Sequence, residues 1–240
     1  MVGVPHNGTL TYGAIHGLLN PSKRHDAMVV DYPSSLLAAG FNVLWCRALN
    51  AFEQGKITHL AFLHADIAPS EMWVDKLVDE MDGLGADFVS VVVPIKDRRG
   101  LTSTGIGDPS NAWMPFRRFT MREIMAMPET FDAASAGYPD KYLLHNSGCW
   151  VADLRRPVFR GDDVPFFTIN DKIVREGGVW RTVVEPEDWC FSRMLWERCA
   201  KTFATRKVCV VHYGLAGFGN ACGWGEWEHD VATRKTWGPQ

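Results

Sequence analysis

The chain has 240 residues, of which 46% are hydrophobic and 22% charged, and its formal net charge is −3 at pH 7. A chain of this length buries enough apolar surface for a full core without disulfides, and we expect one domain over residues 1–240. The slight excess of acidic residues excludes the overall basic charge that drives non-specific nucleic-acid binding, although a local basic groove remains compatible with it.

The cysteines and the apolar runs indicate the cellular compartment of the protein. Six cysteines are scattered without a CxxC pair, which is typical of reduced thiols. The first ten residues contain no charged stretch followed by an apolar one, so no signal peptide is predicted. The most apolar run, residues 88–95, is far shorter than the ~20 residues of a membrane-spanning helix. We therefore expect a cytoplasmic protein without membrane insertion.

Strand-like and helix-like patterns alternate along the first hundred residues. Strands are predicted at residues 1–5, 25–31, 57–63 and 86–95, and helices at 41–54 and from 69 to about 81. The apolar run at 57–63 is typical of a central strand that is covered on both faces. The alternation predicts an α/β fold with a mainly parallel sheet.

The later part of the chain is less regular. Loops are predicted at residues 98–113 and 214–230, helices at 120–127 and 186–200, and strands at 142–152 and 208–212. Acidic residues in the first turn of the 186–200 helix stand where the helix dipole favours them.

A polar tripeptide, His64-Ala65-Asp66, follows the apolar strand at 57–63. Ligands of open α/β sheets bind beyond the carboxyl ends of the strands. A carboxylate there is a hard oxygen ligand for Mg²⁺ or Mn²⁺, which proteins hold with one or two carboxylates plus substrate phosphates. The alternative is structural: Asp66 caps the next helix and His64 is an ordinary polar residue at a strand end.

Two further segments carry candidate chemistry. Glu187 and Asp188 begin the 186–200 helix, and neighbouring carboxylates raise one another's pKa, which suits a general base. Simple charging of a helix start is the alternative. His212 ends the strand at 208–212 and is either a metal ligand or a structural histidine.

The chain resembles a GT-A glycosyltransferase of the family-2-like group, which includes phage-encoded members. The resemblance rests on four segments and their order along the chain: HAD, NSG, EPEDW and VVHYG. The resemblance spans roughly residues 1–230. It implies a Rossmann-like, twisted, mainly parallel sheet with helices on both faces. Residues 1–100 would bind the nucleotide-sugar, and residues 101–240 would bind the acceptor.

The resemblance assigns roles to the motif residues. It implies a metal site at Asp66 and His212, filled by Mn²⁺ or Mg²⁺ with the donor diphosphate, and a catalytic base at Asp188, with Glu187 as the second choice. His64 stands where the family has the first acid of its DxD motif, so only the final carboxylate is kept. His64 would instead hydrogen-bond the donor ribose or diphosphate.

A donor site for a nucleotide-sugar, expected to be a UDP-sugar, is also implied. Its residues would be Pro5, His6, Asp31, Asn42, Arg47, His64 and Lys96. Arg47 is the better phosphate partner chemically, but Asn42 matches the family position about as well, and the spacing does not decide between them. Lys96 either neutralises the diphosphate or is an ordinary solvated lysine, and the hydroxyls of residues 102–104 would contact the sugar.

The acceptor side would be built around a turn and two indoles. The predicted acceptor-binding residues are Asn146, Ser147, Gly148, Trp150 and Trp189, because an indole face stacks well on a sugar. The acceptor would be a glycan, a protein or a hydroxymethylated DNA base. A DNA groove would require eight basic residues to cluster: Lys96, Arg98, Arg99, Arg117, Arg118, Arg155, Arg156 and Arg160.

The predicted reaction is therefore transfer of a sugar from a nucleotide-sugar to an acceptor hydroxyl, with inversion at the anomeric carbon. Two alternatives use the same residues. One is a metal-dependent phosphoesterase or nucleotide-sugar hydrolase. The other is a catalytically silent nucleotide-sugar-binding protein, which the incomplete DxD motif makes plausible.

Overall fold

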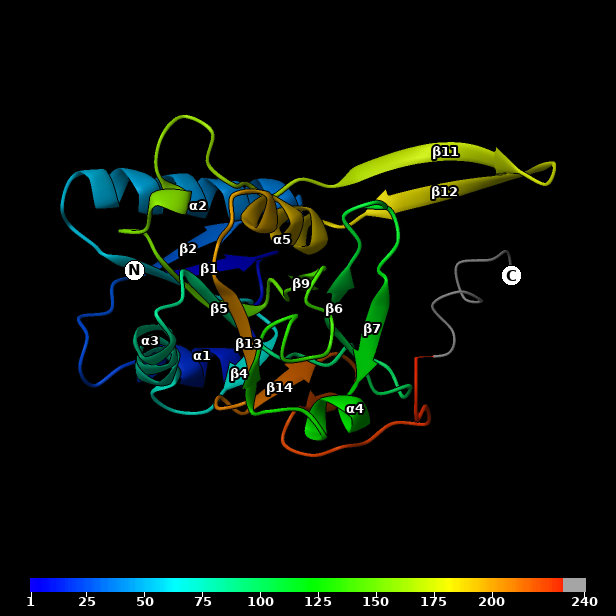
Figure 1. Ribbon diagram of the computed structural model, residues 1–240. Helices are drawn as coiled ribbons and strands as arrows, with labels where there is room; N and C mark the ends of the chain where they lie inside the picture. Colours follow the sequence, from blue (N-terminus) through cyan, green and yellow to red (C-terminus); the bar gives the residue numbers. More distant parts are fainter. Residues whose placement is uncertain (231–240) are drawn as a thin grey trace.

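A computed structural model describes residues 1–230; the last ten residues of the predicted acceptor-binding half lie outside the described part. Its centre is a seven-stranded sheet (Figure 1). In spatial order the strands are β2 (Val29–Pro33), β1 (Val2–His6), β3 (His59–Leu63), β10 (Cys149–Asp153), β5 (Phe88–Val91), β13 (Thr202–Thr205) and β8 (Thr130–Phe131). Five strands run in one direction, and β10 and β8 oppose them. The prediction of a Rossmann-like α/β fold with a mainly parallel sheet is confirmed.

Helices cover both faces of this sheet (Figure 1). They are α1 (Tyr12–Leu19), α2 (Leu37–Glu53), α3 (Trp73–Leu84), α4 (Met121–Met125) and α5 (Glu187–Glu197), with a 3₁₀ turn at Pro157–Phe159. Within residues 1–230, no helix is both long and apolar enough to cross a membrane.

The two halves of the core follow from the alternation of side chains along the strands. Phe62 and Trp150 face α2 and α5, where they join Trp45 and other aromatic residues. Their strand neighbours Leu63 and Val151 face the opposite side and pack with α3. The apolar run predicted as a central strand at 57–63 is thus buried on both faces as β3, whereas the strand predicted at 25–31 is the half-exposed edge strand β2.

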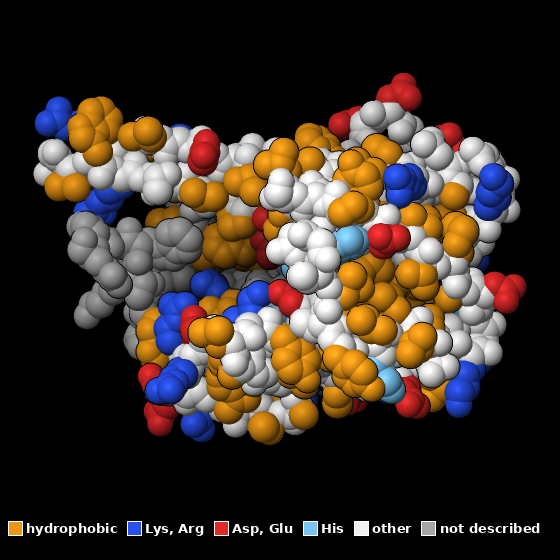
Figure 2. Space-filling view, turned by 180° about the vertical axis from the view of Figure 1, so that it is seen from behind, with side chains coloured by type: hydrophobic (Ala, Val, Ile, Leu, Met, Phe, Trp, Pro, Cys, Tyr) orange, Lys and Arg blue, Asp and Glu red, His pale blue; other side chains and the backbone are white. Residues whose placement is uncertain are grey.

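Three small sheets flank the central one. They are β15-β14-β4, β7-β6-β9 and the hairpin β11-β12. Their strands are β4 (Ile67–Pro69), β6 (Leu101–Gly107), β7 (Arg117–Thr120), β9 (Tyr142–Leu144), β11 (Asn170–Glu176), β12 (Val179–Glu185), β14 (Val210–Tyr213) and β15 (Gly217–Gly219). The hairpin projects from the body of the protein (Figures 1 and 2).

Several predicted elements are corrected by long-range pairing. The helix expected from residue 69 begins at Trp73, because residues 67–69 form β4 and pair with β14. The loop predicted at 98–113 contains β6, and the loop predicted at 214–230 contains β15. The strand predicted at 142–152 is two strands, β9 and β10, which join different sheets on either side of a turn.

Candidate functional site

A cavity of about 450 Å³ opens at the carboxyl ends of β1 and β3. This volume lies in the range of small-molecule sites. Four predicted site residues contribute to its wall: Pro5, His6, His64 and Asp66. Hydroxyl and amide side chains that the sequence analysis did not single out contribute as well: Asn7, Thr9, Thr11, Ser34 and Ser35.

The loop from β1 to α1 forms one wall of this cavity. Thr11 caps α1 by accepting a hydrogen bond from the Ala14 N–H at 3.2 Å, and its own hydroxyl and N–H both donate to the Ala65 carbonyl, at 3.1 and 2.9 Å. Gly13 lets the helix approach β4, because a Cβ there would lie 2.4 Å from the Ala68 Cβ. A threonine before an apolar stretch is a helix-start signal that could have revealed α1 from the sequence.

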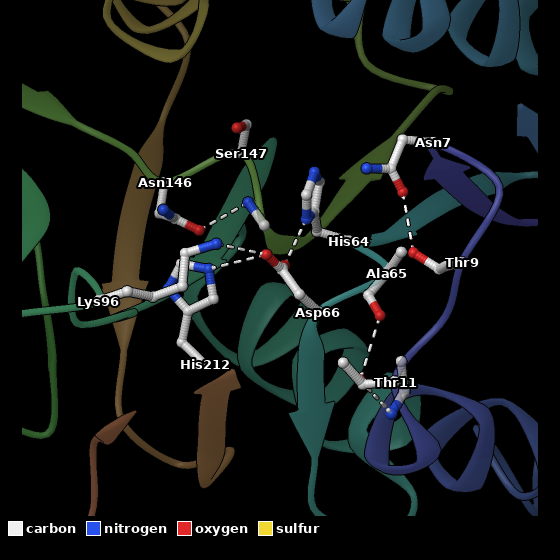
Figure 3. A network of polar contacts seen from close by, with 12 residues as sticks. Asn7, Thr9, Thr11, His64, Ala65, Asp66, Lys96, Asn146, Ser147 and His212 are labelled. Carbon is white, nitrogen blue, oxygen red and sulfur yellow. Dashed lines mark hydrogen bonds and ion pairs between the residues drawn. The ribbon is translucent and has the colours of Figure 1, made fainter. Parts of the chain in front are cut away.

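Three basic side chains converge on the carboxylate of Asp66 (Figure 3). His64 Nδ1 lies 2.5 Å from Asp66 Oδ1, whereas Lys96 Nζ and His212 Nε2 lie 2.6 and 3.5 Å from Oδ2. Burial alone would raise the pKa of Asp66, but hydrogen bonds from His212, His64 and Lys96 hold it well below its usual range. Asp66 is therefore a carboxylate at neutral pH.

Strand pairing brings these residues together. β4 runs antiparallel to β14, with Ile67 opposite His212, and the Asp66 carbonyl accepts the Tyr213 N–H at 2.8 Å. His212 Nδ1 donates to the Pro94 carbonyl at 2.8 Å. Lys96 follows Pro94 by two residues, so one segment after β5 positions both the Lys96 ammonium and the His212 ring.

The predicted divalent ion fits this donor set poorly. A carbonyl can only accept, so His212 Nδ1 carries a proton, and Nε2 is the ring nitrogen that faces Asp66. The Lys96 ammonium already contacts the same oxygen of Asp66, so an ion placed there would meet a positive charge. Within residues 1–230, no group of three or more His, Cys, Asp or Glu side chains is arranged to hold an ion.

The predicted acceptor-side turn lies directly beside this cluster (Figure 3). Asn146 Oδ1 accepts the Gly148 N–H at 2.6 Å, and the Gly148 carbonyl accepts the His64 N–H at 2.7 Å. A Cβ on Gly148 would lie 2.2 Å from Ile67 Cδ1, so the turn requires glycine at this position. The Trp150 indole N–H donates to the Ser147 carbonyl at 3.1 Å and anchors the turn to the core.

The acidic pair at the start of α5 lies on the other side of the turn. The Ser147 hydroxyl approaches Glu187 Oε1 at 3.5 Å, and Asp188 Oδ1 accepts the Trp189 N–H at 2.9 Å. Burial raises the pKa of Glu187. The pKa of Asp188 is raised well above its usual value, first by burial and then by the neighbouring Glu187 charge. Both groups therefore have the affinity for protons that the sequence prediction required.

At the far end of the cavity, two predicted donor residues form a pair. His6 Nε2 lies 3.0 Å from Asp31 Oδ2, and this hydrogen bond lowers the pKa of Asp31. Arg47 lies close by: it donates to the Asp31 carbonyl at 3.4 Å, and its guanidinium carbon is 5.2 Å from the centroid of the Tyr32 ring.

Other predicted site residues are committed to the interior. Asn42 donates to the Phe167 carbonyl at 2.7 Å and accepts the Phe167 N–H at 2.8 Å. Trp150 is fully buried, and Trp189 is 7% exposed and packs with β9 residues. Thr102 is buried and donates to backbone carbonyls, so its hydroxyl does not face a sugar. These side chains hold the fold around the site and have little surface to offer a ligand.

The eight basic residues do not form one groove. Arg155 and Arg156 pair with Asp153 at the end of β10, which lies opposite His59, the first residue of β3. Arg160 contacts the Arg155 carbonyl. These three arginines therefore lie at the sheet edge opposite the cavity, whereas Lys96 lies at the cavity edge. The basic groove required for a DNA acceptor is not formed by this set.

Comparison with known proteins supports the fold alone. No protein-family model matches the chain, and no curated protein matches it. Among solved structures, the chain is similar to A197 from STIV, with a TM-score of 0.50 and 17% sequence identity over 89% of this chain and 84% of that one. An identity this low indicates a shared architecture and carries no information about activity.

Proposed function

We propose that this protein is a GT-A-type glycosyltransferase that binds a nucleotide-sugar in the cavity and transfers the sugar to an acceptor hydroxyl. One observation carries the proposal: a chain of contacts leads from the cavity wall at His64 and Asp66 to the pair of carboxyls at the start of α5. Asp66 contacts His64, the His64 N–H donates to the turn at Gly148, and Ser147 of that turn approaches Glu187. Such a site has a cationic end for phosphate and a basic group for a hydroxyl.

The donor would lie along the cavity with its diphosphate at Asp66. The His6–Asp31 pair offers an acceptor for a uracil-type imide or a ribose hydroxyl, in keeping with the UDP-sugar expected from the sequence. The serine and threonine hydroxyls of the wall suit the ribose. At the other end, Lys96 would contact the diphosphate oxygens, and the His64 ring nitrogen that faces away from Asp66 would accept a hydrogen bond from a ribose hydroxyl.

The transfer step uses Asp188 as the base. Asp188 takes the proton of the acceptor hydroxyl while the acceptor oxygen forms a bond to the anomeric carbon. The bond from that carbon to the diphosphate oxygen breaks, and its electron pair stays on the diphosphate. A raised pKa makes Asp188 a stronger proton acceptor near neutral pH. The positive charge at Lys96 stabilises the departing anion. The resemblance implies attack from the opposite face and hence inversion.

Thermal stabilisation by nucleotides tests the donor site. We expect one nucleoside diphosphate from a panel of UDP, GDP, CDP and dTDP to raise the Tm, since a ligand at 100 times its Kd stabilises by about 2.7 kcal/mol. Asp66→Asn should weaken the effect, because Asp66 positions the Lys96 ammonium and the His64 ring. Asp26→Asn, at an exposed aspartate beside a separate pocket at the opposite edge of the sheet, should leave it intact. No shift with any nucleotide would overturn the proposal.

Product analysis then identifies the reaction. With the matching nucleotide-sugar, we expect transfer to a glycan or a protein, and hydroxymethylated DNA serves as the third acceptor in the assay. Asp188→Asn should abolish transfer without weakening nucleotide binding. Release of free sugar at a rate that no acceptor increases would instead favour a hydrolase, and binding without turnover would favour a nucleotide-sugar-binding protein.

A further inference from the structure

We infer that Lys96 occupies the cation position at Asp66, so that the site binds a diphosphate without a divalent ion. This inference rests on the proposed nucleotide site and specifies how that site supplies its positive charge.

The contacts at Asp66 leave one position for a cation, and Lys96 fills it. The Lys96 ammonium lies 2.6 Å from Asp66 Oδ2, and His212 Nε2 approaches the same oxygen at 3.5 Å. The other carboxylate oxygen is engaged by His64 at 2.5 Å. An ammonium has three protons, and Asp66 uses one of them, which leaves donors for phosphate oxygens.

The position of Lys96 is built into the fold. A Cβ on Gly214 would lie 3.2 Å from Lys96 Cδ and 3.5 Å from its Cβ, so the glycine backbone lies along the lysine stem. Pro94, two residues earlier, is fixed by its hydrogen bond with His212 and by a β-bridge to Thr102. The stem of Lys96 and the backbone before it are thus held in place, and 40% of the side chain is exposed and accessible to a ligand.

Charge balance favours the lysine over an ion. Asp66 contributes one negative charge and Lys96 one positive charge, so these two groups together carry no net charge before the ligand binds. A divalent ion on Asp66 would lie within a few ångströms of the ammonium, and charges of the same sign at that distance repel strongly in a partly buried site. Ion and lysine are therefore alternatives.

Manganese binding tests this assignment without any nucleotide. By electron paramagnetic resonance we expect the wild type to bind no more Mn²⁺ than Asp66→Asn does. Lys96→Ala should acquire a site that disappears again in the Lys96→Ala/Asp66→Asn double variant. Lys96→Met, which keeps the stem beside Gly214, should acquire the same site, and circular dichroism of each variant checks that it is folded. The matched control is Lys56→Ala, which removes an exposed lysine just before the start of β3, at the end of the strand away from Asp66. The inference would be overturned if the wild type bound Mn²⁺ at Asp66 as tightly as Lys96→Ala does. It would also be overturned if neither Lys96 variant gained a Mn²⁺ site.

Nucleotide binding provides the second readout, by calorimetry in EDTA or in Mn²⁺. The wild type should bind its nucleoside diphosphate equally well in both. Lys96→Ala should bind about tenfold or more weakly in EDTA, as loss of a charge-assisted hydrogen bond predicts, and Mn²⁺ should restore binding. Wild-type binding that requires Mn²⁺ would refute the role of Lys96 and leave the proposed function standing. No binding of any diphosphate would refute both.

Discussion

Two neighbouring tryptophans in the core differ in one respect that stability measurements can detect. Trp45 and Trp150 are 1% and 0% exposed, and their ring centroids lie 6.2 Å apart. The Trp150 indole N–H donates to the Ser147 carbonyl, whereas the buried Trp45 N–H has no hydrogen-bond partner among the described residues. Replacement by phenylalanine removes the same atoms from both side chains, but only the replacement of Trp150 also removes a hydrogen bond.

The expected difference follows from the two N–H groups. Both substitutions lose the second ring of the indole and its packing. Trp150→Phe also loses a net stabilisation of about 1 kcal/mol and leaves the Ser147 carbonyl unpaired, whereas Trp45→Phe removes a buried unpaired donor that costs about 1–3 kcal/mol. We therefore expect Trp150→Phe to be the more destabilising by about 2 kcal/mol.

Urea denaturation of both variants measures this difference, provided that the m-values match that of the wild type. Equal losses of stability, or a larger loss in Trp45→Phe, would refute the reasoning.

Trp150→Phe should also affect the proposed activity. Because Ser147 lies beside Glu187, Trp150→Phe should slow sugar transfer more than it weakens nucleotide binding.

Three further predictions follow from individual contacts. Burial raises the pKa of Asp188 above its unfolded value, so its ionisation costs stability as the pH rises through and beyond that value. Asp188→Asn should therefore gain stability over the wild type in urea melts at neutral pH but not below about pH 3.5; a gain that is the same at both pH values would contradict this. Asn42→Ala should lose about 2–4 kcal/mol, because both backbone groups of Phe167 lose their partner, and calorimetry should find nucleotide binding unchanged. Gly13→Ala should lose about 1–3 kcal/mol of unfolding free energy in urea melts through overpacking against β4, and a neutral result would show that α1 can shift.

Local pattern was sufficient for the parts of the site that follow a buried strand. The apolar run before His64 predicts a central strand, and polar residues after such a strand lie at its carboxyl edge. The polar residues after β1 obey the same logic, whereas the acidic start of α5 follows the largely exposed hairpin strand β12 and was identified from its charge pattern. Asp66 and Asp188 were therefore placed correctly at strand and helix ends from the sequence alone, although their roles remain predictions.

Long-range pairing decides what local pattern could not. Asn42 is bound by a residue 125 positions later in the chain, so its helical position near the donor side said nothing about its partner. Trp150 adjoins the turn in sequence, but the alternation of β10 directs its ring into the core. The pairing of β4 with β14, which brings His212 to Asp66, overrides the helix-start signal of residues 69–70. In each case the contact joins segments that no sequence window contains.

The presence of His64 and of Lys96 beside a single carboxylate has one electrostatic explanation. Two carboxylates and a divalent ion carry no net charge together, and neither do one carboxylate and one ammonium. With Asp66 as the one carboxylate, a divalent ion would leave the cluster positive, whereas Lys96 balances its charge. The His64 ring also donates to Asp66 at 2.5 Å, which an ionised acid at this position could not do. A variant with a second acid and no lysine, His64→Asp combined with Lys96→Ala, should therefore bind Mn²⁺ more tightly than Lys96→Ala alone. Equal affinities in the Mn²⁺ titration would show that the two positions are not linked by charge.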